Sequence, residues 1–258
     1  NATINGSTGS SAITFDSSVD EVDVRLHNVT VAVSGTADGA GRGASLVVLS
    51  GTATRFALSL NWTNVTLGGT GSSAVVAAYG DRSGNVTLWM GYSMVVNNRS
   101  RSSGSLTSPS TGHGRSALVH AANATNVSVR MEWSYAWFVA PREEAAEFVA
   151  VDAGCVRANV SLSVAWSRVS VTTSVRSGLV CVANCSARWT SIELVGSELT
   201  LASLGTAAIM HEPHPYATAP SNGTIVTLQN TNVLLSAPRA YFLQNASANF
   251  VKVDAGCA

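Results

Sequence analysis

Few side chains in this chain could do chemistry, because charged residues make up only 12% of it. Acidic residues gather in two groups, at Asp16, Asp20, Glu21 and Asp23 and at Glu143, Glu144 and Glu147. Carboxylates are good calcium ligands, but neither spacing fits a known calcium loop, and charge groups in loops are usually solvated. We therefore expect no metal site at either group.

Two short motifs contain histidine, which serves in catalytic and zinc sites. Gly112-His113-Gly114 matches a tripeptide of polygalacturonases, but the Asn-Thr-Asp and Asp-Asp motifs expected with it are absent. His211-Glu212-Pro213-His214 holds two imidazoles and a carboxylate, yet its proline and the missing third ligand favour a rigid turn. We predict no catalytic residue, metal or cofactor, and expect that the chain is not an enzyme.

Potential glycan acceptors are the most frequent chemical signal. Thirteen of the seventeen asparagines begin an Asn-x-Ser/Thr triplet, far more than chance gives. This excess predicts N-glycosylation, hence a secreted or cell-surface protein, although Asn, Ser and Thr could also simply fill turns and exposed strand positions. The acceptors are Asn1, Asn5, Asn28, Asn61, Asn64, Asn85, Asn98, Asn123, Asn126, Asn159, Asn184, Asn222 and Asn245.

The net charge and the hydropathy of the chain argue against nucleic acid and membranes as its partners. Fifteen acidic residues balance fifteen basic ones, so no overall field draws the chain to nucleic acid or to an anionic membrane. No stretch is long and apolar enough for a membrane span, and the chain opens without a charged and apolar leader, as a mature or excised segment would.

Pairs of apolar residues separated by one polar residue recur at intervals of 25 to 41 residues, as in a solenoid. After some of these pairs, a second pair follows at a constant offset, as Val31 and Val33 follow Leu26. The first pairs are Val24/Leu26, Leu58/Leu60, Val86/Leu88, Val127/Val129, Val160/Leu162, Ile192/Leu194, Val226/Leu228 and Val251/Val253. The other second pairs are Val65/Leu67, Leu199/Leu201 and Val233/Leu235.

A third apolar segment precedes most repeats, as at 74–76, 117–119, 148–151, 179–182, 208–210 and 241–243. Three short strands per coil predict an all-β, right-handed parallel β-helix of about eight coils over residues 11–258, after a polar, linker-like segment at 1–10. An antiparallel sandwich or propeller is the competing fold. Both ends stop within a coil, which suggests end-to-end contact with copies or with more of the same chain.

Alternation sets which side chains face outward. In the triplets at Asn85, Asn126 and Asn159 the acceptor and its hydroxyl residue both face solvent, so we expect glycans there and at Asn64. Trp89, which follows inward Leu88, should point outward, where it could stack on a sugar or pack under a loop.

The four cysteines fit neither a disulfide scaffold nor a zinc site. Cys155 and Cys185 precede the first strands of successive coils at similar offsets, so we predict a disulfide between them, with free thiols or a Cys181–Cys185 bond as alternatives. Cys181 is expected to be a buried thiol at an inward position beside Val119, Ala150 and Met210, and Cys257 has no evident partner.

The sequence has three distinctive features that form its texture. They are the Asn-Val-Thr/Ser-Leu/Val segments, the scarcity of lysine, and the repeated Val-Asp-Ala-Gly-Cys at Val151–Cys155 and Val253–Cys257. This texture resembles the dispersed gene family surface glycoproteins of trypanosomatid protists. The resemblance implies a very large surface protein with pectate-lyase-like β-helix regions and an adhesive role. We therefore expect an extracellular structural or adhesive protein, with a carbohydrate-active β-helix enzyme as the alternative.

Overall fold

The computed structural model describes residues 2–38, 41–80, 83–99, 115–122, 124–140, 145–152, 158–183, 187–211, 223–244 and 250–254. Regular structure in these ranges is entirely β. They contain no helix that could cross a membrane.

The strands of the described residues form three parallel sheets of eight strands each. Sheet A consists of β1 (Ala2–Thr8), β4 (Thr30–Thr36), β7 (Asn64–Gly69), β10 (Met94–Arg99), β13 (Tyr135–Val139), β16 (Arg168–Thr173), β19 (Glu198–Ser203) and β22 (Asn232–Ser236). Sheet B consists of β2 (Ser11–Phe15), β5 (Arg42–Leu49), β8 (Ser72–Ala78), β11 (Arg115–Ala122), β14 (Ala145–Asp152), β17 (Arg176–Ala183), β20 (Thr206–His211) and β23 (Arg239–Gln244). Sheet C consists of β3 (Val19–His27), β6 (Ala53–Asn61), β9 (Ser83–Gly91), β12 (Ala124–Glu132), β15 (Ala158–Ala165), β18 (Ala187–Val195), β21 (Thr224–Gln229) and β24 (Phe250–Asp254).

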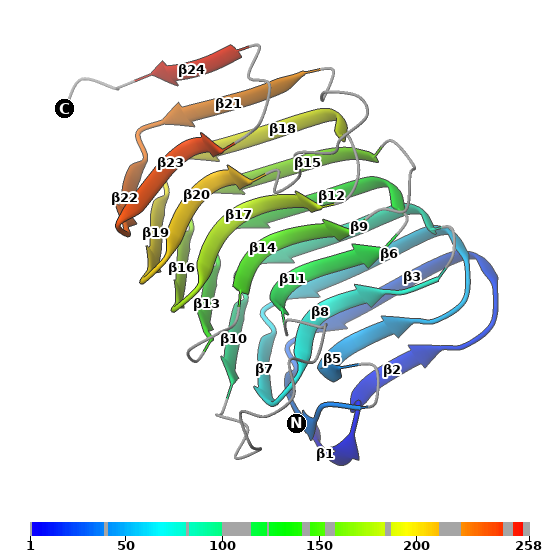
Figure 1. Ribbon diagram of the computed structural model, residues 1–258. Helices are drawn as coiled ribbons and strands as arrows, with labels where there is room; N and C mark the ends of the chain where they lie inside the picture. Colours follow the sequence, from blue (N-terminus) through cyan, green and yellow to red (C-terminus); the bar gives the residue numbers. More distant parts are fainter. Residues whose placement is uncertain are drawn as a thin grey trace.

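The chain visits sheets C, A and B in turn, so each circuit adds one strand to every sheet (Figure 1). This arrangement confirms the predicted parallel β-helix with three strands per coil. Neighbouring coils supply the hydrogen-bond partners of each backbone, which is why many short strands rich in Val, Ser and Thr suffice.

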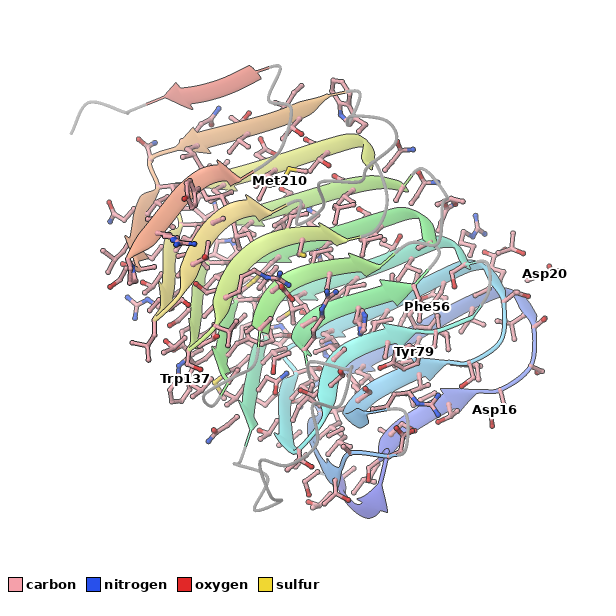
Figure 2. The ribbon with its side chains drawn as sticks, viewed as in Figure 1. Asp16, Asp20, Phe56, Tyr79, Trp137 and Met210 are labelled. Atoms are coloured by element: carbon pink, nitrogen blue, oxygen red, sulfur yellow. The ribbon has the colours of Figure 1, made fainter. Side chains whose placement is uncertain are left out.

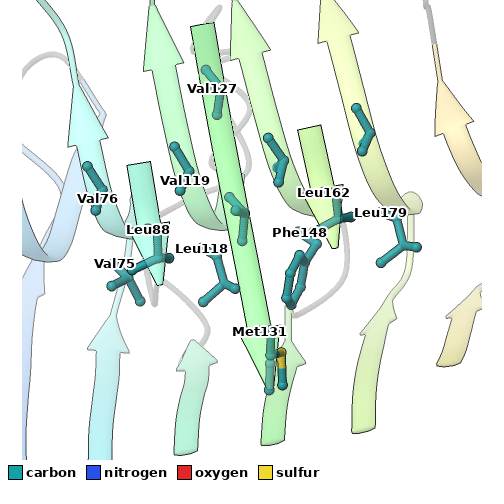
Figure 3. Close-up of a cluster of buried hydrophobic side chains, with 14 of the residues drawn as sticks. Val75, Val76, Leu88, Leu118, Val119, Val127, Met131, Phe148, Leu162 and Leu179 are labelled. Carbon is teal, nitrogen blue, oxygen red and sulfur yellow. The ribbon is translucent and has the colours of Figure 1, made fainter. Parts of the chain in front are cut away.

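Apolar side chains from all three sheets fill the space between them (Figure 3). In sheet C the second inward column runs through Leu26, Leu60, Met90, Met131, Val164, Leu194 and Leu228. The pairs inferred from sequence for β9, β12 and β15 therefore lie two residues too early in register. A slip of two keeps each side chain on the same face, so the inward assignment was still correct.

The strands of sheet B bend. Val75 and Val76 both belong to the buried core, as do Leu118 and Val119 (Figure 3). Consecutive residues of a straight strand face opposite sides, so two adjacent inward residues require a bend between them. The bend shifts the alternation by one residue in the second half of β5, β8, β11, β14 and β17.

Residues 1–10 were expected to form a linker, but Ala2–Thr8 form β1, which pairs in parallel with β4. Ile4 aligns with Val33 and packs against the core. Polar and glycine residues can join a sheet here because the ladder is made by backbone groups, which need no apolar side chain.

Candidate binding groove

One residue with a left-handed backbone turns the chain from sheet C to sheet A in successive coils. Its φ lies between +48° and +55° at Asn28, Trp62, Tyr92, Trp133, Trp166, Gly196 and Asn230. Gly and Asn tolerate this conformation, whereas a bulky side chain there is uncommon and costs roughly 1–2 kcal/mol. Four coils nevertheless place an aromatic residue at this corner.

A buried ladder of hydroxyl groups holds the corner in shape. The Ser93 N–H donates to Ser134 Oγ (2.9 Å), and Ser134 Oγ donates to the Glu132 carbonyl (2.7 Å). The pattern repeats along the rod, with N–H donors on Thr63, Ser93, Ser134, Ser167 and Ser197 and hydroxyl acceptors on Ser93, Ser134, Ser167, Ser197 and Thr231. Each hydroxyl thus satisfies backbone groups in two coils.

The aromatic side chains at the corner form two stacked pairs. The ring centroids of Trp62 and Tyr92 lie 4.6 Å apart with planes at 6°, and those of Trp133 and Trp166 lie 5.6 Å apart at 13°. The Trp166 ring also covers Gly196, the corner residue of the next coil, where a Cβ would overlap the ring. Even so, each of the four aromatic side chains is 50–57% exposed.

A groove of about 480 Å³ runs along this corner. Its lining includes Tyr92, Trp133 and Trp166. It also includes residues that open the strands of sheet A, namely Asn64, Met94, Tyr135, Arg168 and Glu198. Arg168 pairs with Glu198 (2.6 Å), so the two charges in the groove neutralise each other.

No family model, curated protein or solved structure matches this chain. Functional inference therefore rests on its own residues.

The predicted glycan acceptors fall into three groups in the structure. Asn28, Asn64, Asn85 and Asn98 are exposed, whereas Asn61, Asn126 and Asn159 are partly buried. Asn5 lies in β1. Asn1, Asn123, Asn184, Asn222 and Asn245 lie outside the described residues.

Three of these acceptors contact one another across the outer face of sheet C. Asn126 Nδ2 donates to Asn85 Oδ1 (2.6 Å), and Asn159 Nδ2 donates to Asn126 Oδ1 (2.7 Å). Such an amide ladder is itself a reason for asparagine to recur at the same position in neighbouring strands. The repeated triplets in β9, β12 and β15 thus have a structural explanation beside the glycan one.

Two carboxylates of the first acidic group form ion pairs with arginines. Glu21 pairs with Arg55, and Asp23 pairs with Arg25. Asp16 and Asp20 lie on the outside of the first coils, far from Trp137 (Figure 2). Within the described residues no three potential ligands lie close enough to hold a metal ion. Glu143, Glu144, His113 and residues 212–214 lie outside those residues.

Glu147 is buried on the outer side of sheet B and accepts a hydrogen bond from Arg176 Nε (2.8 Å). Burial alone would lower the pKa of Arg176, but the charge of Glu147 and the hydrogen bond to it outweigh burial, so the pKa of Arg176 is raised. Arg176 therefore stays charged, and its ion pair with Glu147 joins β17 to β14.

Cys181 is fully buried as expected, but the inward position assigned to it was wrong. It aligns with Ala150 and His211, while its neighbour Val180 aligns with Val149 and Met210 in the core. The bend in sheet B moved the alternation by one residue and caused the error. Cys155, Cys185 and Cys257 lie outside the described residues, so the predicted disulfide does too.

Trp89 lies on the outer face of sheet C, where its ring covers Gly91. The corner aromatics were missed by sequence reasoning as a group. Their signal was present as an aromatic, Gly or Asn followed by Ser or Thr after most first strands: Trp62-Thr63, Tyr92-Ser93, Trp133-Ser134, Trp166-Ser167, Gly196-Ser197 and Asn230-Thr231.

Proposed function

We propose that this chain is an extracellular, N-glycosylated adhesive β-helix that binds its ligand at the aromatic corner. The supporting observation is the placement of large aromatic side chains at left-handed positions. Four such residues cost roughly 4–8 kcal/mol in all, whereas two stacked aromatic pairs return about 1–3 kcal/mol beyond area burial. Asn28 and Asn230 occupy the same corner position in other coils. A strained residue that folding does not require suggests binding.

A cell-adhesion assay tests this proposal with substitutions that keep the left-handed backbone of the corner. Trp62, Tyr92, Trp133 and Trp166 are all replaced by Asn, which tolerates the left-handed backbone and creates no new glycan acceptor triplet here. Beads coated with wild-type protein should be retained on a monolayer of cultured epithelial cells, and beads with the variant should wash off. Equal retention of both would contradict the proposed site.

Glycan mapping tests the extracellular assignment. The protein is secreted from cultured eukaryotic cells, and each acceptor is scored by mass spectrometry after enzymatic deglycosylation. Asn64, which is exposed and outside the amide ladder, should be occupied more fully than Asn126, whose amide bonds to both neighbours. Failure to secrete, or bare asparagine at Asn64, Asn85 and Asn159 together, would remove the support for a glycoprotein.

End-to-end contact extends the proposal. Val24 and Leu26 of β3 are only partly buried, whereas the residues beside them in β6 are buried by coils on both sides. A further coil stacked on β3 would complete their burial and pair its edge. Sedimentation of the protein at rising concentration should therefore show linear assembly, and a constant monomer mass would count against contacts between copies.

A further inference from the structure

The groove at the corner is built from the same unit in three successive coils. Tyr92, Trp133 and Trp166 each contribute one ring, and Met94, Tyr135 and Arg168 each open the next strand two residues later. Parallel pairing keeps these residues aligned along the rod, one coil apart. A surface with this repeat presents equivalent contacts at a spacing of about 4.8 Å. It is suited to a ligand that is itself an extended polymer of similar units.

The walls of the groove fit a ligand rich in hydroxyl groups. Tyr92 and Tyr135 both line the groove, and each carries a hydroxyl group that can donate and accept hydrogen bonds. Aromatic side chains supply apolar surface that can contact the C–H groups of a sugar ring, while amide and hydroxyl groups bind its oxygens. A peptide that binds by strand addition would need an unpaired strand edge, and here the sheet edges lie at the ends of the rod.

The charge of the groove restricts the ligand further. Arg168 and Glu198 are its charged residues, and they pair with each other at 2.6 Å. An acidic polysaccharide would have to compete with Glu198 for the one guanidinium and would meet that carboxylate nearby. A neutral chain avoids both costs.

We propose that the corner groove binds a neutral, extended polysaccharide whose axis runs along the rod. This inference rests on the proposed function, because it takes the aromatic corner as the binding surface, and it adds the chemical class of the ligand. Successive sugar units would lie against Tyr92, Trp133 and Trp166, with their hydroxyl groups toward Tyr135.

Calorimetry with defined sugars tests the inference. Cellohexaose, chitohexaose, laminarihexaose and mannohexaose serve as neutral probes, and a galacturonic acid hexamer serves as the charged one. At least one neutral hexamer should bind the wild-type protein more tightly than the acidic hexamer does. In Trp133→Asn/Trp166→Asn its affinity should fall on the order of tenfold or more.

The matched control is Trp189→Ser, which removes a half-exposed tryptophan of sheet C outside the groove and should leave the affinity within about twofold. Circular dichroism confirms that each variant is folded. The inference is overturned if no neutral hexamer binds, if the double variant binds equally, or if the acidic hexamer binds best.

Two further results separate this inference from the proposed function. If adhesion to cells depends on the corner aromatics but no neutral hexamer binds, the site stands and the ligand class is wrong. If the rings instead mediate association of copies, sedimentation will show a wild-type oligomer that the double variant dissolves, and the polysaccharide assignment fails.

Discussion

At the scale of single residues, the serine hydroxyls are the least expected contributors to stability. Ser134 is buried. Its Oγ accepts a hydrogen bond from the Ser93 N–H in the neighbouring coil and donates one to the Glu132 carbonyl in its own coil. Replacing Ser134 with Ala leaves the Ser93 N–H without this partner. We expect Ser134→Ala to lower the free energy of unfolding by about 1–3 kcal/mol in urea titrations.

The control for this prediction is Ser191→Ala on the outer, partly exposed face of sheet C, where a change within about 0.5 kcal/mol is expected. An equal loss at both positions would show that the ladder has no special role.

The ion pairs of Arg176 and Arg168 differ in burial, so we expect their contributions to stability to differ as well. The side chains of Arg176 and Glu147 are 18% and 0% exposed, whereas those of Arg168 and Glu198 are 62% and 52% exposed. Glu147→Ala removes the carboxylate that pairs with this buried guanidinium and should cost about 3–5 kcal/mol in the free energy of unfolding. Glu198→Ala should cost less than about 1 kcal/mol. Similar costs in chemical denaturation would refute this ranking.

At the scale of elements, the corner between sheets C and A carries the backbone strain. Trp133 there has φ near +49°. Asn tolerates this conformation and Val does not, because its branched Cβ crowds the neighbouring peptide groups. We expect Trp133→Val to be less stable than Trp133→Asn by roughly 1–2 kcal/mol, measured by thermal and urea unfolding.

Trp137→Val and Trp137→Asn provide the control, because Trp137 lies in β13 at an exposed strand position, where Val is the better residue. The order of stability should therefore invert between the two sites. The same order at both would mean that the corner conformation is not the deciding factor.

The strands and their assignment to three sheets were predictable, because alternation and a constant offset between strands are local patterns. The register of β9 was not, since Val86, Leu88 and Met90 are all buried and any two of them fit the pattern. Nor was the buried Asn97, which stands where neighbouring coils have Leu67 and Phe138 and bonds to Ser73. The corner groove escaped prediction because its aromatics lie between strands, where apolar periodicity carries no information.

At the scale of the whole molecule, each coil contacts only its neighbours, so stability should vary along the rod. Coils in the middle are covered on both sides, while β3 and β22 have a neighbour in their sheet on one side only. In native-state hydrogen exchange, amides of β9, β12 and β15 should exchange slowest and those of β3 and β22 fastest. Uniform protection would indicate that the rod unfolds only as a single unit.

The winding of the chain also determines how the molecule would respond to a pull along its axis. The backbone circles the axis, so the load between two coils falls on the hydrogen bonds and packed side chains that join them. Leu60 and Met90 are neighbours in sheet C but 30 residues apart in sequence. Opening that coil would release a length of roughly 100 Å of extended chain. Under tension the rod would lengthen coil by coil and dissipate work at each step.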